Sequence, residues 1–117
     1  MDLAEHIRTK YFATNPLTFV GGWPLSEPNS IALRLWEGST AKYFGQKSTS
    51  EPLLLVLVRH EVYATGSAWC KDFKGMFHQY SDELIAQMSL VGEILHLGKN
   101  AENLHEFQMT FKTIMKG

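Results

Sequence analysis

The run "PLLLVLV" at residues 52–58 is the longest apolar stretch of the chain, and it sets the first expectation for the fold. It is far shorter than the about 20 apolar residues that a helix needs to cross a bilayer. A strand that is apolar at every position is typical of the centre of a sheet that is covered on both sides. We therefore expect residues 53–58 to form a central, doubly covered strand.

Other segments show the period of two that strands produce. Residues 107–115 contain the longest such run, and residues 89–97 also look extended. Between them, "GKNAEN" at 98–103 is rich in turn-forming residues, so the two segments are expected to form an antiparallel hairpin. Residues 81–88 fit either a helix or a strand. A clean alternation also occurs in Ser30–Trp36, where one face carries Ile31, Leu33 and Leu35.

Helical spacing of apolar residues predicts two helices, at residues 2–12 and 62–79. Gly66 and Gly75 each weaken the second helix by roughly 1 kcal/mol. Residues 38–52 are polar and aperiodic, which predicts a long loop, and long loops in compact domains are usually functional or disordered. The order of elements predicts an α+β fold, with a mostly antiparallel four- to five-stranded sheet packed by two helices, in a single domain over residues 1–117.

Composition excludes several classes of protein. The chain of 117 residues is long enough for one domain with one core. Its formal net charge of −1 argues against a dedicated binder of nucleic acid or of acidic membranes. Cys70 is the only cysteine, so no internal disulfide can form. The N-terminus lacks the apolar core of a signal peptide, which predicts a cytoplasmic protein.

Motifs for catalysis or metal binding are incomplete. "HEVYA", starting at His60, begins like the zinc motif HExxH, but alanine stands where the second histidine is needed. The other histidines stand singly in the sequence, and there is no GxSxG nucleophile motif. "YSDE" at 80–83 is more typical of a helix end than of a catalytic triad. The sequence therefore predicts no catalytic residue, no metal site and no cofactor, and we expect a protein that is not an enzyme.

The segment "TFVGGWPLSEPNSIALRLWEG" at residues 18–38 contains an unusually stiff connector. Gly21 and Gly22 permit a turn without side-chain clash, and Pro24 fixes its backbone φ angle. Trp23 supplies a large apolar anchor. These four residues either form a well-packed loop and nothing more, or hold a subunit face in a fixed orientation.

Three stretches occur in a characteristic order: "FVGGWPLSEPNSIAL", "LLLVLVRHEVYATG" and "ILHLGKNAENLHEFQMTFKTI". Together, over about residues 17–114, they resemble the tail terminator (minor capsid) proteins of long-tailed, siphovirus-type bacteriophages. The last stretch is similar to the family's L-G-x-(D/N)-x-x-G-(R/H)-x-E-F hairpin. Asn100 stands where aspartate is common, and "ENLHEF" lacks the glycine usual in that turn. The resemblance implies a single tail-terminator-like domain.

The resemblance also implies a function. Such a protein caps the tail tube as a homohexameric ring, which is compatible with a monomer in free solution. It ends tube polymerisation and provides the surface on which the head docks. Its partners would be further copies of itself, the major tail tube protein and a head-completion or connector protein. DNA would pass through the lumen without specific binding, and no membrane would be involved. The expected location is the head–tail neck of the virion, after assembly in the host cytoplasm.

Candidate interface residues follow from that role. Exposed aromatics and the polar loop would supply contacts between subunits or with neighbouring proteins, through Trp36, Lys42, Tyr43, Phe44 and Lys47. Arg59 closes the central strand and is expected to form an interface contact or an ion pair that fixes the frame, with a solvated charge as the alternative.

Two other functions remain open at this stage. One is a different head–tail neck or completion protein, which would share the virion location but would not cap the tube. The other is a small ligand-binding or enzymatic α+β domain, in which the fold would bring His60, Glu61, His96 and His105 near one another.

Overall fold

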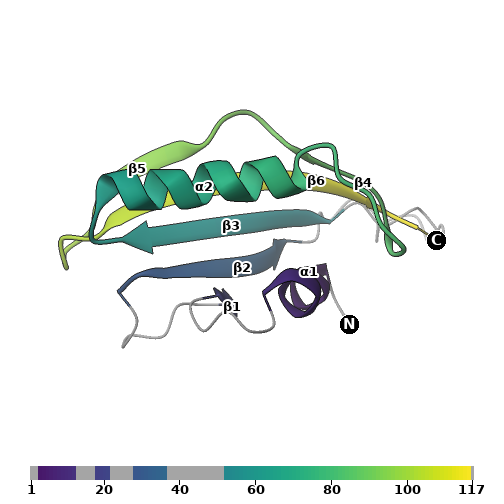
Figure 1. Cartoon of the computed structure of the whole chain (residues 1–117), viewed down its shortest axis with the longest axis horizontal. Coiled ribbons are helices and arrows are strands. Elements are labelled where there is room, and N and C mark those ends of the chain that lie inside the picture. Colours follow the sequence, from purple (N-terminus) through teal and green to yellow (C-terminus); the bar gives the residue numbers. More distant parts are fainter. Residues whose placement is uncertain (1–2, 13–17, 22–27, 37–51, 117) are drawn as a thin grey trace.

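A computed structural model describes residues 3–12, 18–21, 28–36 and 52–116. Within these residues, two helices lie against a six-stranded sheet (Figure 1). In chain order the elements are α1 (Leu3–Tyr11), β1 (Thr18–Val20), β2 (Ser30–Trp36), β3 (Leu53–His60), α2 (Tyr63–Phe77), β4 (Ile85–Leu90), β5 (Leu95–Lys99) and β6 (His105–Met115).

The sheet has the order β1-β2-β3-β6, and both β4 and β5 pair with the remaining edge of β6. The β1–β2 pair is parallel, and all other pairs are antiparallel. Because β1 and β5 lie at one end of the sheet and β4 at the other, the sheet is four or five strands wide along its length. The predicted α+β class is confirmed, and β3 is the central strand as expected.

The core lies between the helices and one side of the sheet, here called the inner face. The strand register places Leu54, Val56 and Val58 of β3 beside Phe111, Met109 and Phe107 of β6. All six side chains are almost completely buried. Both helices contribute one apolar stripe to the same core: Leu3, Ala4 and Ile7 from α1, and Gly66, Cys70, Phe73 and Phe77 from α2.

The expectation that helices or other elements cover residues 53–58 on both faces is wrong for the described part of the chain. The two helices touch each other, because Phe12 at the end of α1 stacks on Phe73 of α2 with ring centroids 5.8 Å apart. Both helices therefore lie on the inner face. The opposite side, here called the outer face, carries Leu53, Leu55 and Leu57 of β3, which are only half-buried.

The chain after α2 also differs from expectation. Residues 89–97 are not one extended segment, since β4 ends at Leu90 and β5 begins at Leu95. Gly92 has a φ of 74°, in the left-handed region that favours glycine, and the chain turns there. The N–H of Val91 still donates to the carbonyl of Thr110 at 2.8 Å, which keeps the turn attached to β6. The two short strands thus share one long partner.

The predicted β5–β6 hairpin is confirmed, and two asparagines stand at the turn positions that were compared with the tail terminator pattern. The Oδ1 atom of Asn100 accepts hydrogen bonds from the backbone N–H groups of Glu102 and Leu104, at 2.9 and 3.0 Å. Asn103 occupies the position where the pattern has glycine, and its φ is 66°. Asparagine is among the residues that best tolerate this conformation. Both asparagines therefore fit the turn.

The two glycines of α2 have opposite roles, and substitution should separate them. A Cβ atom at Gly66 would lie 2.6 Å from the Phe107 ring and 3.2 Å from the Cβ of His60, whereas one at Gly75 would meet nothing within 4 Å. Gly66→Ala should therefore destabilise the protein by about 1–3 kcal/mol through overpacking. Gly75→Ala should stabilise it by up to about 1 kcal/mol through helix propensity. Urea unfolding of both variants measures the difference, and equal effects would contradict this packing.

Candidate functional site

The outer face of the sheet is more apolar than expected for a face that no described helix covers. Leu55 stands between Arg34 and Thr110 in the strand register, and Leu57 stands between Gln108 and the buried Ala32. An antiparallel sheet with one solvated face normally carries polar residues on that face. The half-buried leucines in the middle of the sheet, with Arg34, Thr110 and Gln108 beside them, make the outer face the best candidate for a contact surface.

The edge of the sheet formed by β5 is a second candidate. Among the described strands, β5 pairs only with β6, so its other edge presents unpaired backbone groups. Leu95 and Leu97 on this strand are 51% and 55% exposed. An exposed edge strand with apolar side chains readily pairs with another chain. The β5 edge therefore suits contact with an extended segment of a neighbouring subunit.

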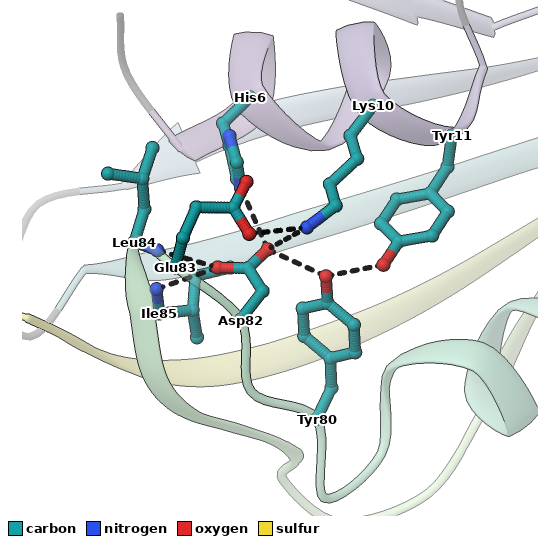
Figure 2. A network of polar contacts seen from close by, with 8 residues as sticks. All are labelled: His6, Lys10, Tyr11, Tyr80, Asp82, Glu83, Leu84 and Ile85. Atoms are coloured by element: carbon teal, nitrogen blue, oxygen red, sulfur yellow. Dashed lines mark hydrogen bonds and ion pairs between the residues drawn. The ribbon is translucent and has the colours of Figure 1, made fainter.

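A polar network around Asp82 joins α1 to the segment between α2 and β4 (Figure 2). The carboxylate accepts hydrogen bonds from five donors. Its Oδ2 atom accepts from His6 Nε2 at 2.8 Å, Tyr80 Oη at 2.6 Å and Lys10 Nζ at 3.3 Å. Its Oδ1 atom accepts from the backbone N–H groups of Leu84 and Ile85 at 2.8 and 2.9 Å.

The network strongly favours the charged form of Asp82. Burial alone would raise the pKa of the Asp82 carboxyl, but the hydrogen bonds from Tyr80, His6 and the two backbone N–H groups outweigh it and hold that pKa well below its usual range. Burial, together with the bonds to Asp82 and Tyr11, raises the pKa of the Tyr80 phenol. The single O–H group of Tyr80 donates its hydrogen bond to Asp82, so in the contact between the two tyrosines the hydroxyl of Tyr11 must be the donor.

This network is better explained as a structural clasp than as a metal site. His6, Asp82 and Glu83 offer ligand atoms that lie within 4.8 Å of one another. However, the ammonium of Lys10 already lies among them, 2.6 Å from Glu83 and 3.3 Å from Asp82. Lysine therefore supplies the positive charge that the carboxylates need. The clasp fixes α1 against the chain that leads into β4.

Most of the interface residues proposed from the sequence lie outside the described residues: Lys42, Tyr43, Phe44 and Lys47, and likewise Gly22, Trp23 and Pro24 of the connector. Trp36 ends β2 and is paired with Leu53 through the backbone. Gly21 has a φ of 94°, and its N–H donates to the carbonyl of Leu33 at 2.9 Å. This φ lies in the left-handed region that favours glycine, directly after β1.

Arg59 is buried and is not a solvated surface charge. Its Nε atom donates to the hydroxyl of Ser30 at 3.2 Å. The two residues are opposite each other in the β2–β3 register, so the bond ties these strands together. Its predicted role at an interface stays a prediction.

The four residues of the rival ligand-binding hypothesis are brought together only in part. His96 and His105 lie close, with Nε2 of the first 3.2 Å from Nδ1 of the second. His60 is opposite His105 in the register, but its ring packs on Trp69, and its Nδ1 accepts the N–H of Val62. The backbone N–H of Glu61 donates to Asn29.

Cys70 gives no sign of reactivity. Its side chain is fully buried, and burial raises the pKa of the thiol to about 12. The thiolate, which is the reactive form, is therefore strongly disfavoured. The cysteine serves as a small apolar residue of the core.

Comparison with known proteins gives a similarity of fold. The chain matches no protein-family model and no curated protein sequence. It is similar to a chain in a solved structure titled "Virion of native gene transfer agent (GTA) particle", with a TM-score of 0.58 and 10% sequence identity. The match covers 87% of this chain and 80% of the other. At this identity the similarity shows a shared fold. Neither described helix has the length and apolar character to cross a membrane.

Proposed function

We propose that this chain is a structural protein of a phage-type virion and that it acts as the tail terminator. The observation that carries the proposal is the fold shared with a chain of a gene transfer agent virion over most of both chains. The ordered sequence stretches that resemble tail terminators support the finer assignment.

The proposed role needs two different ring faces and no covalent chemistry. One face binds the last layer of the tail tube, in place of another layer of tube subunits. The other face offers nothing to a further tube subunit and binds the head-completion or connector protein instead. A rigid sheet such as β2-β3-β6 keeps both faces in a fixed relation. The near-neutral charge of the chain suits a lumen through which DNA passes without binding.

The outer face and the β5 edge supply the contacts that a ring requires. A ring of identical subunits forms when one surface of a subunit binds a different surface of the next and the rotation closes. The β5 edge lies at one side of the sheet, and the leucines of β3 lie at its centre, so the two surfaces are distinct. A homohexamer at the head–tail neck, assembled in the host cytoplasm on the tube from monomers, is the arrangement we propose.

A different neck or completion protein is the nearest alternative, because it would share the virion location and the absence of catalysis. The two roles differ in their effect on the tail. Loss of a tail terminator should give tails of uncontrolled length and unattached heads, as seen by electron microscopy of lysates. Loss of another neck protein should leave tails of normal, uniform length, and that result would overturn the finer assignment.

A further inference from the structure

We propose that His96 and His105 form a binding site for one divalent transition-metal ion of the zinc, copper or nickel class. The two histidines are separate in the sequence, and the β5–β6 hairpin brings their rings together. The proposal concerns the purified chain and does not depend on its role in a virion.

The distance between the two ring nitrogens already suits a shared metal ion. Nε2 of His96 and Nδ1 of His105 are 3.2 Å apart. Two nitrogens that each lie about 2.0–2.1 Å from a tetrahedral zinc ion are separated by about 3.3 Å. The same distance fits an N–H···N hydrogen bond between neutral imidazoles. For both nitrogens to bind one ion, the proton of that hydrogen bond would move to the other nitrogen of the donating ring, and both rings would turn so that their lone pairs point at the ion.

The rings are held in place by their neighbours. The ring of Tyr63, at the start of α2, makes edge contacts with both, at centroid distances of 4.9 Å to His96 and 5.4 Å to His105. The ring of Phe107 lies 5.0 Å from that of His96. His96 nevertheless remains exposed, so an ion can reach the site from solvent. A pair of ligands held in this way loses little conformational freedom when the ion binds.

The type of ligand also limits which ions can bind. Imidazole ligands select zinc, copper and nickel over magnesium and calcium, which prefer oxygen.

The site offers two protein ligands. Among the described residues, no carboxylate, thiol or further imidazole joins the pair to make three ligand atoms within 4.8 Å of one another. Water would complete the coordination. With half of the ligands of a structural zinc site, the dissociation constant should be about 1–100 μM.

Titration of tag-free protein with zinc chloride at neutral pH, followed by calorimetry, tests the proposal. We expect saturable binding of one ion, and no binding of magnesium. His96→Gln and His105→Asn retain hydrogen-bonding groups near the original nitrogens, and each should weaken zinc binding at least about tenfold through the loss of one imidazole ligand. His78→Asn is the matched control at a histidine whose Nδ1 accepts the N–H of Leu90, and it should bind zinc as the unmodified chain does.

Copper adds a readout that locates the ion. Substoichiometric Cu²⁺ should broaden the imidazole NMR signals of His96 and His105 before those of the remaining three histidines. Absence of saturable zinc binding would overturn the proposal. So would zinc affinity that is unchanged in both histidine variants, or copper broadening that begins at another histidine.

Discussion

Leu55→Lys or Leu57→Lys should reduce the yield of complete particles by about a hundredfold or more while leaving the chain folded. Each leucine lies in the middle of the outer face and is half-buried in the isolated chain. In the free protein a lysine there can extend its ammonium into water. In a closed subunit contact the same charge would be desolvated without a partner, which costs several kcal/mol. About 1.4 kcal/mol corresponds to each tenfold loss of affinity.

The matched control is Met76→Lys, which places the same charge at an exposed apolar position on α2, away from the outer face. Thermal unfolding followed by circular dichroism should show that all three variants fold, and particle titres should fall only for the two leucine variants. Normal titres for both leucine variants would show that the outer face is not a contact surface.

Asp82→Ala should cause the largest loss of stability among single polar substitutions in the described residues, about 2–4 kcal/mol in the free energy of unfolding. The Asp82 side chain is 4% exposed, and its removal leaves the donors of His6 and Tyr80 without their acceptor. Asp82→Asn should be nearly as damaging, because an amide would face those donors with N–H groups of its own. Urea unfolding measures both variants.

Glu83→Gln is the control for the same network, because Glu83 is mostly exposed and its contact with Lys10 is a surface ion pair. Such pairs contribute little, so this variant should unfold close to the unmodified chain. If Asp82→Ala were also as stable as the unmodified chain, the network around Asp82 would not be the clasp that fixes α1.

The clasp also gives stability a defined dependence on pH. The pKa of Asp82 in the folded chain lies below its ordinary value of 3.8. Its contribution is therefore complete above about pH 4 and is lost progressively as the pH falls below that value. Asp82→Asn should remove this part of the acid sensitivity.

Much of the frame could be predicted from the sequence because its signals are local. The alternation in Ser30–Trp36 and the apolar run of residues 53–58 identified β2 and β3, and the period of two near the C-terminus identified β6. Helical spacing located both helices to within two residues of their observed ends. Asn103 adopts a positive φ that glycine would also adopt, so the turn forms without a glycine at that position.

The parts that could not be predicted depend on contacts between distant segments. His6 and Asp82 are 76 positions apart, and nothing in either local sequence indicates that they meet. "YSDE" was interpreted as a helix end, although α2 ends at Phe77 and Asp82 organises the following turn. The placement of both helices on one face depends on ring contacts such as Phe12 on Phe73. The spacing of apolar residues along the sequence does not indicate such contacts between distant segments.

The candidate contact surfaces were predicted less completely than the frame. The sequence predicts contacts through the loop at residues 38–52 and through Trp36. The structure adds two candidate contact surfaces, which are the leucines of β3 and the β5 edge. The sequence predicts a doubly covered strand for these leucines, because an apolar run does not reveal what covers it. The described helices both lie on the inner face.

The length distribution of tails made without this chain tests the central claim most directly. The gene is removed from the particle's genome, and tails in negatively stained lysates are measured with and without the unmodified chain supplied from a plasmid. The tail terminator assignment predicts tails of widely varying length beside unattached heads, and a return to one length when the chain is supplied. Tails of a single normal length in the absence of the chain would contradict it.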